Sequence, residues 1–138
     1  MSRKRTRENA YKLIFSYAFR RESNEYAYED ILLNEEMDDS DKEYLSEIFH
    51  NIPLRYDELT ADIAPLLKNY TLDRLAVADL TALVLSAYEL KYMSSVPAKV
   101  SVNEAVNLVK KYSTDQSGAF VNGVLSALVS KFRGGEIK

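Results

Sequence analysis

The 138 residues contain no cysteine and no tryptophan, and they contain one histidine, His50. The absence of cysteine excludes disulfide bonds and thiol chemistry. A single histidine argues against a histidine metal site and against a Ser-His catalytic triad. Three prolines and four glycines are too few for a turn-rich β protein, so the composition favours helices.

Membrane and enzyme signals are also lacking. No apolar run approaches the roughly 20 residues of a transmembrane helix, and the charged start MSRKRTREN has no apolar signal-peptide core. The sequence has neither a phosphate-binding glycine-rich loop nor a cluster of metal ligands. We therefore expect a cytoplasmic protein that has no membrane partner, no cofactor and no enzymatic activity.

Charge is distributed unevenly along the chain. Residues 1–21 carry seven basic side chains and one acidic one, whereas residues 22–47 carry eleven acidic side chains and one basic one. A cationic end followed by an anionic block suggests a directed electrostatic contact. The alternative, that both blocks are solvated surface, stays open at this point.

Apolar residues recur at helical spacing through most of the chain. Ala10, Leu13, Ile14, Tyr17 and Ala18 form the stripe of an amphipathic helix. Residues 73–93 are apolar almost all round, which predicts a central helix surrounded by others. Further helices are expected over about 41–67, with a kink or break near Pro53, and over about 101–112 and 117–132. Their predicted N-caps are Ser40, Thr71, Ser101 and Ser117.

The pair Asn122 and Gly123 falls inside the last predicted helix. Its apolar face carries Phe120, Val121, Val124, Leu125 and Leu128, and the opposite side carries small and polar residues. Glycine inside a helix costs about 1 kcal/mol relative to alanine, and this cost is tolerable where another backbone or a ligand comes close. The stripe therefore serves either close helix packing or an open surface for another molecule.

Two sets of charged residues could recognise a partner. Asp79 and Glu89 interrupt the apolar central helix, where they either form internal hydrogen bonds or salt bridges or recognise a basic partner. The N-terminal basic cluster consists of Arg3, Lys4, Arg5 and Arg7. Because Arg3 and Arg7 project on the apolar side of the first helix, the first turn is expected to overhang the core or to be flexible, within reach of phosphates.

The segments SAYELKY, VPAKVSVNEAVNLVKKYS and AFVNGVLSAL occur in the order and spacing of the NusB family of transcription antitermination factors, which the chain resembles. The basic start RKRTRENAYKLIF also matches, so the resemblance covers essentially the whole chain. It implies one all-helical RNA-binding domain, 1–138, of six to seven helices in two small bundles, about 1–70 and 71–138. It also implies binding to boxA RNA of ribosomal RNA leaders together with NusE, a ribosomal protein, and association with elongating RNA polymerase. No catalysis, cofactor or small-molecule substrate is implied.

The resemblance also assigns site residues. The implied RNA contacts are Arg3, Lys4, Arg5, Arg7, Phe120, Asn122 and Gly123, and the implied NusE contacts are Phe15, Asp73 and Asp79. Three positions depart from the family pattern: Ala119 replaces a common lysine, Ser126 a common aspartate and Val84 a common arginine. These departures either weaken RNA binding or reflect a changed internal ion pair. An alternative function is therefore a protein–protein adaptor that keeps the fold but has weak RNA affinity.

Overall fold

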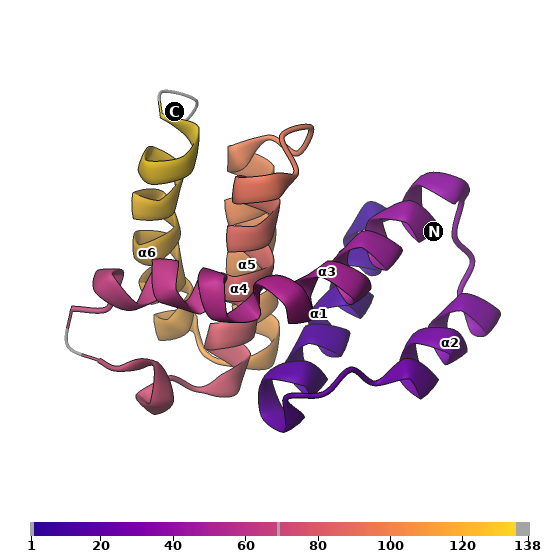
Figure 1. The fold of residues 1–138 in the computed structure, drawn as a ribbon. Coiled ribbons are helices and arrows are strands. Elements are labelled where there is room, and N and C mark those ends of the chain that lie inside the picture. The colour runs from indigo at the N-terminus through magenta and orange to yellow at the C-terminus, as the bar shows by residue number, and fades with distance from the viewer. Residues whose placement is uncertain (1, 69, 135–138) are drawn as a thin grey trace. The chain divides into compact units, whose positions relative to one another are not determined.

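The computed structural model describes residues 2–68 and 70–134 and is shown in Figure 1. These residues form six α-helices and two short 3-10 helices and contain no strand, which confirms the predicted fold class. None of the helices in this part of the chain is long and apolar enough to span a membrane. The chain divides into two compact units, Met1–Tyr56 and Asp57–Lys138. This division falls after Tyr56, whereas the sequence placed a sub-bundle boundary near residue 70.

The first unit contains α1 (Arg3–Arg20), α2 (Glu25–Asn34) and most of α3 (Asp39–Ile63). The apolar stripe predicted for the first helix is confirmed, because Ala10, Leu13 and Ile14 are buried. Leu13 and Ile14 line a small cavity together with Ile48, Phe49 and Ile52 of α3. The unit thus packs α1 against α3 through apolar side chains at helical spacing.

Helix α3 differs from the expectation at its start and at Pro53. The Asp38 carboxylate accepts a hydrogen bond from the Asp41 N–H at 2.8 Å, so Asp38 caps the helix and Ser40 lies inside it. The predicted cap at Ser40 is therefore wrong. The helix continues through Pro53 without a break, because proline removes one donor from the ladder while the neighbouring hydrogen bonds remain. It ends at Ile63 and is followed by the 3-10 turn η1 (Ala64–Leu66).

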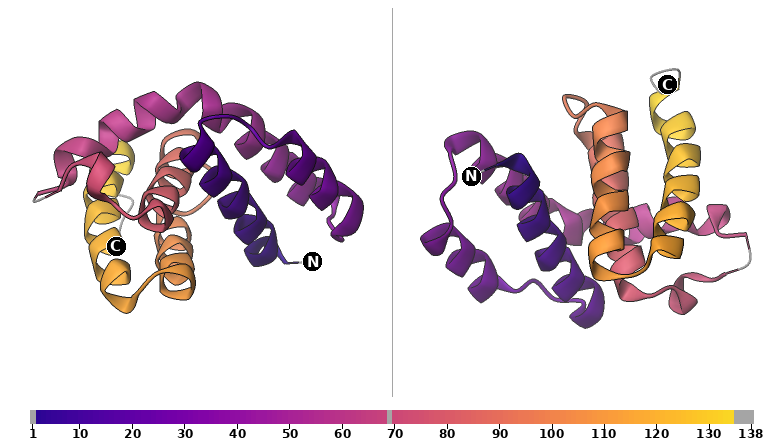
Figure 2. Two further views of the ribbon diagram at one scale, coloured as in Figure 1. Left: turned by 90° about the horizontal axis from the view of Figure 1, so that it is seen from below. Right: turned by 180° about the vertical axis from the view of Figure 1, so that it is seen from behind.

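The second unit is built on α4 (Val77–Tyr92), α5 (Ala98–Tyr112) and α6 (Asp115–Arg133). These three helices all contact one another, and the left view of Figure 2 shows them as one group. The prediction of a central helix is confirmed, since every residue of α4 from Thr81 to Leu90 is buried. The helix begins later than expected because the 3-10 turn η2 (Leu72–Arg74) precedes it.

The N-caps of α5 and α6 also differ from the predicted ones. Ser101 lies buried inside α5, where its hydroxyl and that of Ser86 are 2.7 Å apart, and α5 starts after Pro97. Thr114, rather than Ser117, caps α6 by accepting a hydrogen bond from the Ser117 N–H at 3.0 Å. At the other end of α6 the Arg133 guanidinium donates hydrogen bonds to four carbonyl oxygens at the end of α4 and in the following loop. Two of these oxygens, those of Glu89 and Met93, also accept the backbone N–H groups of Met93 and Val96, so Arg133 adds a second, charged donor to them and ties the end of α6 to the end of α4.

Candidate nucleic-acid interface

The first turn of α1 is tied to the start of α3. The Arg3 guanidinium donates from Nε to the Asp41 carboxylate at 3.0 Å and from Nη2 to the Ser40 hydroxyl at 2.7 Å. It also lies over the Tyr44 ring, 4.7 Å from the ring centre. Burial on its own raises the pKa of the Asp41 carboxyl, but the hydrogen bond and charge of Arg3, together with hydrogen bonds from Thr6 and the Asp38 backbone, hold that pKa below its usual range.

Arg5 makes a bidentate ion pair with Glu35 at the end of α2. Its Nε and Nη2 atoms donate to the two carboxylate oxygens of Glu35 at 3.3 Å and 3.0 Å, and Nη1 donates to Glu8 at 3.3 Å. The hydrogen bond from Arg5 lowers the pKa of the Glu35 carboxyl, and the same bond raises the pKa of Arg5. The carboxylate therefore stays ionised at neutral pH and holds the guanidinium in place.

Arg7 corrects one expectation about the N-terminal basic cluster. Its side chain is only 4% exposed and lies over the Tyr44 ring at 5.6 Å, while Lys4 is exposed. The first turn therefore does not overhang the core. The physical reason is that Tyr44 and the acidic start of α3 supply the partners that buried or half-buried guanidinium groups require.

The stripe of small and polar residues on α6 is open. Asn122 and Gly123 are exposed and intrahelical, and a Cβ atom added to Gly123 would have no neighbour within 4 Å. Gly118, by contrast, is buried, and its added Cβ would lie 3.0 Å from the Lys110 side chain. The Asn122–Gly123 pair is thus exposed and not packed against another helix, whereas Gly118 is closely packed.

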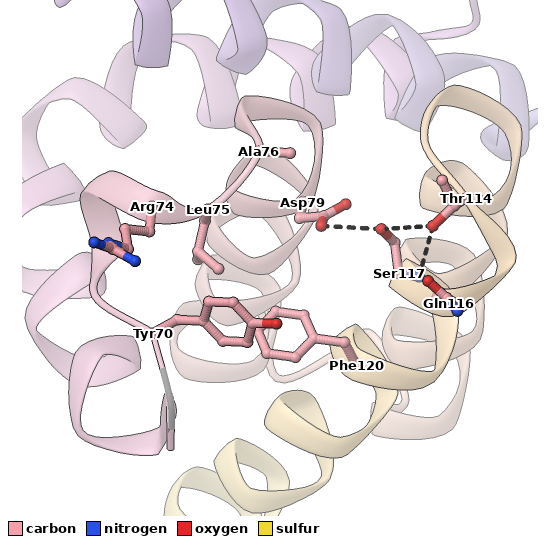
Figure 3. A pocket seen from close by; sticks show the side chains of 9 residues that line it. All are labelled: Tyr70, Arg74, Leu75, Ala76, Asp79, Thr114, Gln116, Ser117 and Phe120. Carbon is pink, nitrogen blue, oxygen red and sulfur yellow. Dashed lines mark hydrogen bonds between the residues drawn. The ribbon is translucent and has the colours of Figure 1, made fainter.

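Two hollows in the second unit share an aromatic wall made by Tyr70 and Phe120. The two rings meet edge to face with their centres 5.7 Å apart. Figure 3 shows the two side chains together at this wall. A hollow of about 470 Å³ is lined by Gly123 and other small residues of α6 and by Pro65 and Lys68. The other hollow, of about 210 Å³, is lined by polar residues as well: Arg74, Asp79, Thr114, Gln116 and Ser117.

Tyr70 is the residue of this wall that the sequence analysis missed. It lies outside every helix, is 53% exposed and has no periodicity to mark it. Its partner Phe120, which the sequence places on the apolar face of α6, is half-buried. An exposed tyrosine beside a half-buried phenylalanine offers ring faces and edges on which a planar group could stack.

The acidic residues of α4 have internal surroundings. Asp79 is 8% exposed, and its Oδ2 atom accepts a hydrogen bond from the Ser117 hydroxyl at 3.0 Å (Figure 3). Glu89 is completely buried. This geometry favours the internal interpretation of both carboxylates, since each sits among the helices of its own unit.

The remaining candidate positions lie on the surface or in the core. Phe15 is 39% exposed, and Asp73 is exposed and accepts a hydrogen bond from the Thr71 hydroxyl. Of the three departures from the family pattern, Ala119 and Ser126 are exposed, so they alter the surface of α6. Val84 is completely buried, so that replacement alters the interior of the second unit.

These features define a small all-helical protein in which most of the candidate residues of the described part of the chain lie on exposed basic and aromatic surfaces. Comparison with known proteins gives the family directly: the model of the NusB family matches residues 4–130, and the chain belongs to that family. It is 41% identical over 129 residues to the transcription antitermination protein NusB of Agathobacter rectalis, covering 91% of this chain and 98% of the relative. It is 36% identical to the NusB protein of Clostridium botulinum, covering 94% of this chain and 100% of the relative.

Solved structures agree with this assignment. The structure of T. maritima NusB superposes with a TM-score of 0.85 at 32% identity and covers 95% of this chain and 92% of its own. A structure of the antitermination factors NusB and NusE in complex with double-stranded RNA gives a TM-score of 0.82 at 27% identity and covers 96% of this chain and 100% of its own. The fold and the family are therefore shared over nearly the whole length of the chain.

Proposed function

We propose that this chain is a transcription antitermination factor that binds boxA-type RNA together with NusE and joins the elongating RNA polymerase. The observation that supports it best is the open aromatic wall of Tyr70 and Phe120 beside the hollow at Gly123. Single-stranded RNA is commonly bound by stacking its bases on aromatic side chains next to cationic groups. Lys68 and Arg74, which line the two hollows on either side of this wall, supply such cations.

Within this proposal the RNA contacts are Arg3, Lys4, Arg5, Arg7, Phe120, Asn122 and Gly123, and Tyr70 is added to them. Arg7 is buried over the Tyr44 ring and must leave it before it can meet RNA. Phe15, Asp73 and Asp79 are proposed as NusE contacts. Among these, Phe15 and Asp73 are exposed, whereas Asp79 is buried and requires a change of its Ser117 hydrogen bond before it can meet a partner.

A second candidate function is a protein–protein adaptor with weak RNA affinity. Two observations favour it. Ala119 lines the larger hollow where the family commonly has a lysine, so this position supplies no cation. Arg3 and Arg5 already form ion pairs with carboxylates. The two functions differ in one measurable quantity, the affinity of the isolated protein for RNA.

The test of the aromatic wall is RNA binding by Tyr70→Ala and Tyr70→Phe. Loss of one base-stacking partner costs about 1–3 kcal/mol, so Tyr70→Ala should weaken binding of a boxA-type RNA by roughly 5-fold to 150-fold. Tyr70→Phe keeps the ring and should bind like the parent. The control is Tyr26→Ala, which removes an exposed tyrosine from the acidic helix α2. Parental affinity in Tyr70→Ala would exclude the wall as the RNA site.

A further inference from the structure

Arg3 and Arg5, the two partly exposed arginines at the start of α1, form ion pairs with carboxylates in the free protein. Arg3 is bound by Asp41 and Arg5 by Glu35, with the nearest nitrogen–oxygen distance 3.0 Å in each pair. Both carboxylates come from the acidic block 22–47, and both pairs lie within the first unit. The basic cluster and the acidic block are therefore one connected structure.

The geometry of the Arg5 pair matters for phosphate binding. A guanidinium group binds a phosphate most strongly through two parallel N–H donors on one edge. The Nε–Nη2 edge of Arg5 is filled by both oxygens of Glu35, and Nη1 donates to Glu8. The same edge of Arg3 is filled by Asp41 and Ser40. A phosphate that approaches either arginine along this edge meets a carboxylate in its place.

The placement of the Glu35 side chain at the end of α2 does not favour the stability of that helix. Glu35 is the C-cap residue of α2, where the negative end of the helix dipole disfavours an acidic side chain. Asp41 lies in the first turn of α3, where the same effect favours an acid. Arg5, with smaller contributions from Asn9 and Lys12, thus offsets the unfavourable placement of the Glu35 carboxylate. The backbone N–H of Glu35 caps α2 by donating to the Ile31 carbonyl, but its side chain is directed to Arg5 and not to the helix end.

We propose that Glu35 and Asp41 compete with RNA phosphates for Arg5 and Arg3, so that these acids set the affinity of the basic cluster for RNA. This inference rests on the proposed RNA-binding function. Binding exchanges one anion for another at each guanidinium, so only an RNA with enough further contacts gains from the exchange. The acids thereby suppress binding of arbitrary RNA that offers phosphates alone.

The experiment compares Glu35→Gln with Glu36→Gln in titrations with a boxA-type RNA and with a poly-uridine of equal length. Both substitutions remove one negative charge from neighbouring positions, but Glu36 is exposed and makes no ion pair with Arg5. Because exposed ion pairs contribute modestly, Glu35→Gln should bind about two- to five-fold more tightly than Glu36→Gln at low salt. The gain should be at least as large for poly-uridine as for the boxA-type RNA.

A second background separates competition for Arg5 from a general charge effect. In Arg5→Ala the advantage of Glu35→Gln over Glu36→Gln should disappear, since the edge for which the anions compete is gone. Equal affinities of the two glutamine variants, weaker binding by Glu35→Gln, or an advantage that persists in Arg5→Ala would each overturn the proposal. If neither the parent nor any variant binds RNA, the proposed function fails; if the parent binds and the variants do not differ, only the competition fails.

Discussion

Gly123 distinguishes an open RNA surface from a packed helix, and one substitution there tests the interpretation. Gly123 lies inside α6, and a Cβ atom at this position would have no neighbour within 4 Å. Replacing it with alanine or leucine should therefore raise the free energy of unfolding by about 0.5–1 kcal/mol through helix propensity alone. For a chain of 138 residues this corresponds to an increase of the melting temperature by about 2–4 °C.

The same substitution should have the opposite effect on RNA binding. A leucine at position 123 projects into the hollow of about 470 Å³ beside Phe120 and removes the space in which we place the RNA. Gly123→Leu should thus be at least as stable as the parent and bind RNA more weakly, as measured by thermal unfolding and an RNA titration on the same preparation.

The matched control is Gly118→Ala, on the same helix. The added methyl group would lie 3.0 Å from the end of the flexible Lys110 side chain, which must shift, and it does not enter the hollow. Gly118→Ala should therefore leave RNA affinity unchanged. A Gly123→Leu protein that is destabilised yet binds RNA normally would refute the reasoning, because that result is what close packing at Gly123 predicts.

Three further predictions concern stability and the partner. Arg133→Ala should lower the free energy of unfolding by about 1–3 kcal/mol in denaturant titrations, because four carbonyl oxygens lose a charged donor; Arg133→Lys should recover only part of this loss. Asp79→Lys should lower the melting temperature, since the carboxylate is buried and bound by Ser117; unchanged capture of NusE by the milder Asp79→Asn would contradict its role as a partner contact. The pKa values of Glu35 and Asp41 are lower in the folded protein than their ordinary values of 4.5 and 3.8, so the ionised carboxylates stabilise the folded state. This contribution is fully present above the ordinary values and is lost as the pH falls through the lowered ones. The double variant Glu35→Gln/Asp41→Asn should therefore show a shallower loss of unfolding free energy between about pH 5 and pH 2 than the parent, and an equal slope would contradict the assignment.

Helical periodicity predicted the fold well because burial follows it closely. The stripe at Ala10, Leu13 and Ile14 is buried, and α4, apolar on all sides, is the buried centre of its unit. The predicted caps at Ser40 and Ser117 were wrong because Asp38 and Thr114, which lie a few residues earlier in the chain, offer equally good acceptors. Sequence spacing does not decide between such neighbours.

The site was less predictable because its contacts join residues far apart in the chain. Arg5 and Glu35 are thirty positions apart, and Tyr70 meets Phe120 from a segment with no helical pattern. The basic cluster and the Asn122–Gly123 pair were visible in the sequence, but the sequence did not decide whether that pair is packed or exposed. Their carboxylate partners and the aromatic wall depend on packing that the sequence pattern does not encode.

The measurement that tests the account most directly is a titration of boxA-type RNA with this protein, alone and in the presence of NusE, at low and at high salt. The account predicts binding by the protein alone at low salt, tighter binding with NusE, and a loss of affinity as salt rises because phosphates are contacted. Capture of NusE without any RNA binding under either condition would contradict it and would establish the adaptor function instead.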